Sequence, residues 1–203
     1  VMWSPVEKTA LAEAEIEYKD IQSTSIYVAF KVKSSSSLVP KDTSIIIWTT
    51  TPWTIPGNRA VAYGKNIGYS LFEVIESEDV QLQNNKFIIA DKLLKDVQEK
   101  CKILKINILK KFIGNDFKNI ICIHPFSGKG YEFDVPLIKG SFVEDSEGTG
   151  FVHIAPSYGE DDYNLALENN IAISDIVKDD GCYKDDTPMF SGIHVFKAHT
   201  SVI

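Results

Sequence analysis

The stretch GTGFVHIAPSYGEDDY, residues 148–163, combines a strand, a loop and a helix start in a short space. Phe151–Ile154 is an apolar run that predicts a strand, and Pro156 closes it. Gly159 and Glu160 then predict the start of a helix, because apolar side chains follow them at helical spacing. A short strand followed by a modest helix is typical of folds that mix sheet and helix.

Similar short strands are predicted along the rest of the chain. Alternating or β-branched runs lie at 26–32, 45–48, 60–63, 69–75, 80–90, 103–112, 120–123 and 131–138, with two asparagines at 84–85 that could divide the fifth. Asp91–Cys101 is the clearest helix, with Asp91 as its N-cap, and an Asp-Gly pair at 180–181 predicts a hairpin over 176–183. The pattern predicts a β-rich α+β fold, a single domain over 1–203 with a β-barrel-like core and peripheral helices.

Composition limits the class of protein. With 203 residues, 44% hydrophobic and 24% charged, the chain is long and apolar enough to bury a core. It has no apolar run of the roughly 18 residues that a membrane helix needs, and its first residues have no signal-peptide pattern. The first residue is not Met, which suggests a fragment of a longer protein. Three widely spaced cysteines favour a reducing compartment, and we expect a cytoplasmic protein.

Charge is distributed unevenly along the sequence. The formal net charge of −7 argues against a general nucleic-acid binder. Residues 86–118, however, hold nine lysines against four acids, whereas residues 141–190 hold twelve acids against two lysines. Such asymmetry allows one face to meet phosphates and another to meet a cation, although a solvated lysine-rich face is the simpler alternative.

Three consecutive threonines form the first candidate site. Thr49, Thr50 and Thr51 stand where a predicted strand ends, just before Pro52. Hydroxyls at such a position can donate and accept hydrogen bonds, and a loop exposes backbone N–H groups beside them. The alternative is that threonines simply suit strands.

Residues 148–163 form the second candidate. Gly148 and Gly150 would let a ligand approach the backbone closely. His153 points to the opposite face of its strand from its two neighbours. Asp161 and Asp162 lie in the first turn of a predicted helix, where the macrodipole keeps a carboxylate ionised. A core histidine and a pair of helix-capping acids are the structural alternatives.

Other chemistries have weaker support. The histidine and acids of residues 148–163 match no metal-binding motif, so no metal site is predicted. The sequence also has no phosphate-binding loop, no deaminase signature and no Gly-x-Ser-x-Gly elbow. His124, His194 and His199 have no partner that the sequence identifies, and we interpret them as structural.

Taken together, the two motifs resemble a known family. WTTTPWTIPGN at 48–58 and GTGFVHIAPSYGEDDY at 148–163 closely resemble the signature segments of the editing domain, also called connective polypeptide 1 (CP1), that is inserted in the class I isoleucyl-tRNA synthetases. The opening WSPVE and EAEIEY segments resemble the entry to that insertion, so the resemblance spans essentially the whole chain. In the sister leucyl and valyl enzymes the threonine run typically leads into Arg-Pro, and the position of His153 is usually methionine or lysine. Residues 86–118 match nothing that the family lets us carry over.

The resemblance implies a hydrolase that removes valine mistakenly attached to tRNA(Ile). A hydrophobic pocket separates side chains that differ by one methylene only about 10- to 200-fold, and the isoleucyl enzymes are the standard illustration of that limit. Thr49, Thr50 and Thr51 would orient the terminal ribose, the ester carbonyl and a water, and Asp162 would hold the α-ammonium group. The substrate-binding residues that the family implies are Trp48, Trp53, Gly148, Thr149, Gly150, His153 and Asp162, with His153 helping to exclude isoleucine.

The implied reaction needs neither a protein nucleophile nor a cofactor, because the aminoacyl ester is already activated. ATP and Mg are expected only at the synthetic site of the longer enzyme. The implied partners are the 3′ end of tRNA(Ile) and the remainder of the synthetase chain, with no membrane. Valyl-adenylate is a further potential substrate. Two alternatives stay open: an inert module that docks the tRNA acceptor end, and a metal-dependent phosphoesterase.

Overall fold

The computed structural model describes residues 2–20, 23–34, 39–198 and 202. His199, which the sequence suggests is structural, lies outside these residues.

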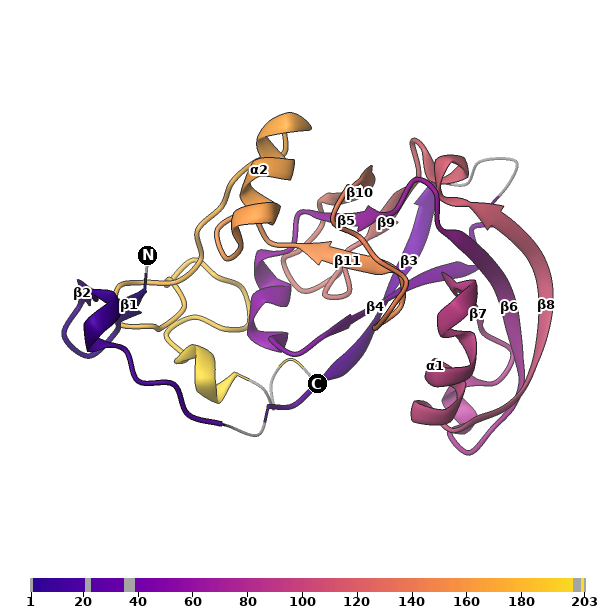
Figure 1. Ribbon diagram of the computed structural model, residues 1–203, viewed down its shortest axis with the longest axis horizontal. Coiled ribbons are helices and arrows are strands. Elements are labelled where there is room, and N and C mark those ends of the chain that lie inside the picture. The colour runs from indigo at the N-terminus through magenta and orange to yellow at the C-terminus, as the bar shows by residue number, and fades with distance from the viewer. Residues whose placement is uncertain (1, 21–22, 35–38, 199–201, 203) are drawn as a thin grey trace.

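In the described chain, nine strands form one mixed sheet, which is the body of the molecule (Figure 1). In the order in which they pair, they are β11 (Phe151–Ile154), β5 (Ala60–Tyr63), β10 (Asp134–Lys139), β9 (Ile121–Ile123), β3 (Ile26–Ser34), β4 (Thr43–Thr49), β7 (Lys86–Ala90), β6 (Gly68–Ser77) and β8 (Ile103–Ile113). The pairs β5–β10 and β4–β7 are parallel, and the other pairs are antiparallel.

The sheet curls strongly but stays open, which corrects the expected barrel-like core. β11 packs against β4 as well as pairing with β5. The Ala90 N–H donates to the Thr149 carbonyl at 2.8 Å, and the Tyr69 hydroxyl donates to the Gly150 carbonyl at 2.7 Å. Within the described residues, however, the edge strands β11 and β8 do not pair with each other. The result is a β-rich α+β domain built on a curled sheet.

In the residues that the structure describes, helices are few and short. The α-helices are α1 (Leu94–Lys100) and α2 (Glu160–Glu168), and the 3₁₀ helices are η1 (Glu13–Glu15), η2 (Pro52–Gly57), η3 (Val80–Leu82), η4 (Asp91–Leu93), η5 (Gly114–Phe117) and η6 (Val195–Lys197). Val97 of α1 packs with apolar side chains of β4, β6 and β7, and Leu165 of α2 packs with those of β5, β10 and β11. None of the helices in the described part of the chain has the length and apolar character that crossing a membrane requires.

Most predicted elements form, and the differences have local causes. β5 and β11 begin and end at the predicted residues. The strand predicted over 80–90 is divided, because Asn84 takes a left-handed backbone with φ of 64°, and only β7 remains extended. The helix predicted from Asp91 starts with the η4 turn, whose N-cap is Ala90. The Asp91 carboxylate instead accepts a hydrogen bond from the Ser70 hydroxyl, so Asp91 is not the predicted cap.

The C-terminal segment and the first residues lie together, at the left of Figure 1. β1 (Trp3–Ser4) and β2 (Thr9–Ala10) pair, and the Trp3 indole N–H donates to the Asp179 carbonyl at 2.8 Å. The hairpin predicted over 176–183 is present, since Val177 and Tyr183 are bridged and Gly181 turns the chain with φ of 75°. Tyr183 is fully buried here, and its hydroxyl donates to the Trp53 carbonyl at 2.6 Å. The C-terminal hairpin is therefore hydrogen-bonded to η2.

Candidate functional site

The threonine run Thr49–Thr51 lies where β4 ends and η2 is about to begin. Thr49 is buried, whereas Thr50 and Thr51 are exposed. The Thr51 N–H donates to the Thr49 hydroxyl oxygen at 3.1 Å, and the two hydroxyl oxygens lie 3.3 Å apart. The run therefore forms a compact turn that holds two hydroxyls close together and leaves that of Thr51 near solvent.

Thr54, which the sequence did not single out, connects this run to His153. It is buried in η2, and its hydroxyl donates to the Thr51 carbonyl at 2.9 Å. The same oxygen lies 2.9 Å from His153 Nε2, across 99 positions of sequence. Because the Thr54 proton is given to the Thr51 carbonyl, its oxygen accepts from the imidazole Nε2–H.

The second imidazole nitrogen contacts Asn58, another residue that the sequence did not assign to the site. Asn58 is fully buried, and its amide nitrogen lies 2.8 Å from the Ala60 carbonyl and 3.4 Å from His153 Nδ1. One proton arrangement satisfies these contacts: Asn58 donates to Nδ1, and Nε2–H donates to Thr54. The Asn58 Oδ1 atom is buried and has no partner among the described residues.

His153 is neutral in this setting. Burial, and to a smaller extent the charge of His124, lower the pKa of His153 to about 4. With both nitrogens engaged, the ring is oriented rather than available as a general base. It fits the wall of a binding site better than proton transfer.

Asp162 is the third residue of α2, and its surroundings differ from the prediction. Its Oδ2 atom accepts from the Ala155 N–H at 2.8 Å, which joins the helix start to the end of β11. Burial raises the pKa of Asp162, and the negative charge of Asp161 adds to that effect. The helix start was expected to keep this carboxylate ionised, but desolvation outweighs the backbone hydrogen bond. In the described part of the chain, no hydrogen bond to its other oxygen, Oδ1, is formed.

An aromatic cleft of about 950 Å³ opens beside the start of α2. Its lining comprises Trp3, Trp53, Pro156, Ser157, Tyr158, Gly159, Glu160, Tyr163, Ile173 and Asp175. The rings of Trp53 and Tyr158 meet edge to face with centroids 5.1 Å apart. A side chain at Gly159 would lie 3.2 Å from the Asp162 carboxyl carbon, so this glycine lets that carboxyl approach the cleft wall.

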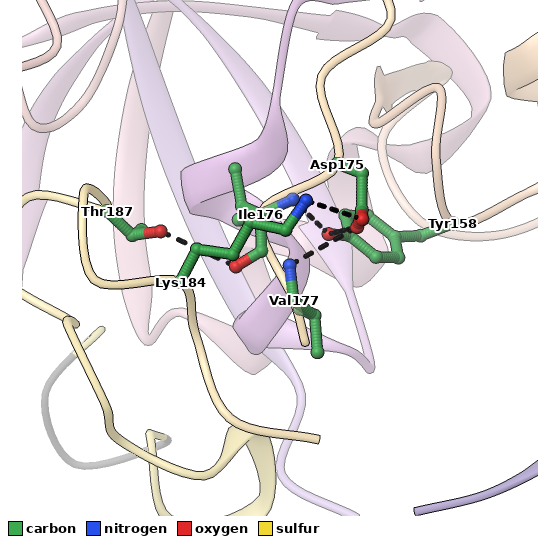
Figure 2. A network of polar contacts seen from close by, with 6 residues as sticks. All are labelled: Tyr158, Asp175, Ile176, Val177, Lys184 and Thr187. Atoms are coloured by element: carbon green, nitrogen blue, oxygen red, sulfur yellow. Dashed lines mark hydrogen bonds and ion pairs between the residues drawn. The ribbon is translucent and has the colours of Figure 1, made fainter. Parts of the chain in front are cut away.

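A polar network holds the far wall of the aromatic cleft in place (Figure 2). The Tyr158 hydroxyl accepts from the Ile176 N–H at 2.8 Å and donates to Asp175 at 3.1 Å. Lys184 lies 2.8 Å from the same carboxylate, and Val177 N–H donates to it at 3.2 Å. Burial would raise the pKa of Asp175, but these donors outweigh it and lower the pKa. The aromatic wall is therefore fixed by the segment that follows α2.

Trp48 and the glycines lie at a different hollow, of about 340 Å³. Its lining comprises Trp48, Phe142, Glu144, Ser146, Glu147, Gly148, Thr149, Gly150, Phe151 and Val152. A Cβ atom at Gly148 would lie 3.4 Å from the Trp48 ring, and one at Gly150 would lie 2.4 Å from the Ala90 Cβ. Thr149 is buried and exchanges hydrogen bonds with the Phe151 backbone. Packing accounts for these residues, and their role in binding stays a prediction.

His124 and His194 have structural partners. His124 Nε2–H donates to the Ile55 carbonyl at 3.1 Å, its Nδ1 accepts from the Phe126 N–H at 3.1 Å, and its ring stacks on Tyr131. His194 Nδ1 accepts from the Phe196 N–H at 3.3 Å at the start of η6. Among the described residues, no group of three or more histidine, cysteine or acidic side chains is placed to hold a metal ion.

The curled sheet has the fold of the editing domains of aminoacyl-tRNA synthetases. The crystal structure of GlLeuRS-CP1 superimposes with a TM-score of 0.62 over 79% of this chain and 75% of that one, at 14% identity. The editing domain of the Plasmodium falciparum cytosolic leucyl-tRNA synthetase, with deletions of insertions 1 and 3, gives a TM-score of 0.51 over 64% and 48% at 18% identity. At such identities these likenesses establish the fold alone.

Sequence relatives identify the family. The isoleucine–tRNA ligase of Pelagibacter ubique is 47% identical over 203 residues, which are 100% of this chain and 22% of that protein. The Gluconobacter oxydans enzyme is 47% identical over 202 residues, 98% of this chain and 21% of that protein. No family model matches the chain. The chain belongs to the isoleucine–tRNA ligase family, and it spans about one fifth of the length of these curated relatives.

Proposed function

We propose that the chain edits misacylated tRNA, hydrolysing the ester that joins valine to the 3′ end of tRNA(Ile). The observation that carries the proposal is the hydrogen-bonded chain from Thr51 through Thr54 to His153. It ends two residues before Ala155, whose N–H binds Asp162. The first motif is thus hydrogen-bonded to His153 of the second, and Asp162 is bound to the end of the same strand.

The chemistry asked of this site is modest. An aminoacyl ester is activated, so a positioned water and oriented donors supply the catalysis without a protein nucleophile. The clustered hydroxyls of Thr49 and Thr51, 3.3 Å apart, suit the orientation of a ribose hydroxyl, a carbonyl and a water. Thr50, exposed at the same turn, adds a third hydroxyl.

His153 and Asp162 would select the amino acid. A neutral, fully hydrogen-bonded imidazole presents a fixed ring edge that limits the size of the side chain it meets. Asp162 would bind the α-ammonium group through a charge-assisted hydrogen bond. Desolvation raises the pKa of Asp162, so its ionised form lacks solvation in the free protein. A bound α-ammonium group would stabilise this ionised form and would itself be bound more tightly.

The aromatic cleft would receive the terminal base of the RNA. Single-stranded RNA ends are bound by stacking of unpaired bases on aromatic side chains. Trp53 and Tyr158 offer such rings next to the start of α2. Trp48 would shape the neighbouring surface rather than touch the reacting atoms.

A second candidate is a module that docks the tRNA end without hydrolysing the ester. The hydrogen bond from Ala155 to Asp162 favours it, because this carboxylate already has a structural task. A metal-dependent phosphoesterase is the third candidate.

Deacylation of valyl-tRNA(Ile) and isoleucyl-tRNA(Ile) by the chain, with and without EDTA, distinguishes the three. Editing predicts release of valine in preference to isoleucine and no effect of EDTA. A docking module would bind both RNAs and release neither amino acid. Loss of activity with EDTA would replace our proposal by the metal-dependent one.

Two substitutions at Asp162 separate its structural task from the clamp. Asp162→Asn keeps an oxygen that can accept from Ala155 but removes the charge, and Asp162→Ala removes both. We expect both variants to lose valine release by at least about 100-fold, about the cost of a lost charge-assisted contact. Only the alanine variant should also lose thermal stability. If Asp162→Asn hydrolysed valyl-tRNA(Ile) like the wild type, Asp162 would not be the clamp.

A further inference from the structure

A basic hollow of about 590 Å³ lies on the molecule outside the candidate site. Its polar lining consists of Tyr63, Lys65, Lys118, Lys139, Asn115, Asn119 and Asn169, and no acidic residue of the described chain lines it. We call it the lysine hollow. The three lysines are exposed, and none takes part in an ion pair with a described residue.

The backbone beneath the lysine hollow is held firmly. Gly114 packs so closely on the loop before β6 that a Cβ atom there would lie 2.0 Å from the Gly64 carbonyl oxygen. The Asn115 N–H donates to the Lys65 carbonyl at 3.2 Å, and the Gly140 N–H donates to the Tyr63 carbonyl at 3.0 Å. Lys65 and Lys139 are therefore fixed beside each other at the ends of the parallel strands β5 and β10.

Lys118, the third lysine of the hollow, follows the buried ring of Phe117 in sequence. Phe117 is fully buried and meets the Tyr63 ring edge to face, with centroids 5.8 Å apart. Asn119 then takes a left-handed backbone with φ of 65°, which turns the chain into β9. The fold thus places three lysines from three separate segments around one hollow. Their mutual repulsion is relieved only by a bound anion or by solvent.

The rest of the lysine-rich stretch 86–118 is arranged differently. Five of its lysines each lie within 4.0 Å of a carboxylate oxygen: Lys86, Lys92, Lys100, Lys102 and Lys111. Of that stretch, Lys118 is the member that lines the hollow. Five of the nine lysines in this stretch are therefore paired with acids, and the other two lysines of the hollow, Lys65 and Lys139, come from elsewhere in the chain.

Helix α2 relates the lysine hollow to the candidate site. Its first turn carries Asp162, and its C-cap, Asn169, lines the hollow. These residues are seven positions apart, or about 10 Å along the axis at about 1.5 Å per residue. Asn169 also caps the last turn, since its amide donates to the Leu165 carbonyl at 2.9 Å. β5, β9 and β10 lie side by side near this helix (Figure 1).

We propose that the lysine hollow binds the phosphate backbone of the RNA strand whose 3′ end enters the candidate site. This inference rests on the proposed function. About 10 Å corresponds to roughly three nucleotides at about 3.4 Å per phosphate along one stacked strand. Lysine ammonium groups bind phosphates without reading sequence, and asparagine side chains can donate to phosphate and sugar oxygens. The hollow fixes the register of the strand, and the candidate site acts on its end.

The test compares two triple variants of equal charge. Lys65→Ala, Lys118→Ala and Lys139→Ala together remove the hollow's cations. Lys31→Ala, Lys95→Ala and Lys105→Ala together remove three exposed lysines that do not line it. The probe is a fluorescent, deacylated RNA minihelix with a single-stranded 3′ end, and anisotropy gives its affinity from 25 to about 200 mM salt. Circular dichroism melts confirm that both variants fold, and single substitutions replace a triple that does not.

We expect the hollow variant to bind at least tenfold more weakly at the lowest salt than the wild type. The slope of log affinity against log salt should become less steep by about 2 to 3. This corresponds to just under one for each lysine–phosphate contact that is lost. The control triple should change both quantities much less. Equal behaviour of the two triples would overturn the lysine hollow as an RNA contact, and so would a wild-type affinity that does not depend on salt.

Cross-linking locates the contact and separates this inference from the function it rests on. A photoreactive uridine three nucleotides from the 3′ end should cross-link to peptides of the lysine hollow, and cross-links confined to other surfaces would contradict the inference. The RNA is deacylated, so hydrolysis plays no part in the measurement. Intact, hollow-dependent binding with no valine release would overturn the editing proposal alone.

Discussion

The orientation of His153 depends on the single hydroxyl of Thr54. That hydroxyl is buried and contacts both the Thr51 carbonyl and the imidazole of His153, which is 99 residues away from Thr54 in sequence. If it is removed, the imidazole Nε2–H and the Thr51 carbonyl both lose a partner in a place that water reaches poorly.

We therefore expect Thr54→Val, which keeps the shape of the side chain, to cost about 1 to 3 kcal/mol of unfolding free energy in urea titrations. The preference for releasing valine over isoleucine should fall at least about tenfold, because the ring that gauges side-chain size is no longer fixed. Thr54→Ser is the matched control and should keep both properties. A valine variant that retained the wild-type preference would show that His153 does not need this support.

The element that positions the second motif is the turn before β11. Gly150 has a φ of 77°, and a Cβ atom there would lie 2.4 Å from the Ala90 Cβ. Gly128 has a φ of 88°, yet a Cβ atom there would meet nothing within 4 Å. The two glycines thus share backbone strain and differ in packing.

Alanine substitution should separate these effects. Gly128→Ala should cost about 1 kcal/mol, from left-handed backbone strain alone. Gly150→Ala should cost about 3 kcal/mol or more, since it adds overpacking between β7 and β11. Thermal melts of both variants give the comparison. Equal losses would mean that the contact between these strands relaxes at no cost, and that Gly150 is present for another reason.

At the scale of the whole molecule, two buried histidines make stability depend on pH. Burial lowers the pKa values of His124 and His153 to about 4, whereas an unfolded histidine titrates near about 6.5. Between these values the unfolded chain binds more protons than the folded chain, so stability is complete above about pH 6.5 and falls as pH drops towards 4. Asp162 acts in the opposite direction, because its raised pKa favours protonation in the folded state.

Urea titrations at pH 7, 6 and 5 should therefore give an unfolding free energy that decreases by a few kcal/mol across this range. Ring-carbon NMR shifts of the two histidines should stay those of the neutral form down to about pH 5. A histidine of the buried pair that titrated near pH 6.5 would contradict the hydrogen-bonding pattern described for it.

The sequence predicted the positions of individual strands better than the order in which those strands pair in the sheet. β5 and β11 were predicted to the residue, because each is a short, mostly apolar run with a glycine at one end, Gly64 after β5 and Gly150 before β11. The order of the strands in the sheet was not predictable, since β10 enters between β5 and β9 through contacts across the length of the chain. The contacts of Thr54 and Asn58 with His153 could not be predicted for the same reason. Their roles depend on His153, which the fold brings to them and local sequence does not reveal.

The edge strand β8 has one side that pairs with no other described strand. It is 11 residues long, and Leu104, Ile108 and Leu109 are exposed on it, a combination that invites a strand from another copy to add on. Its lysines would bring like charges into contact in any such pair and so oppose association. Chemical acetylation of these amines would remove that repulsion, and a solution of the protein would then be prone to form fibrous aggregates.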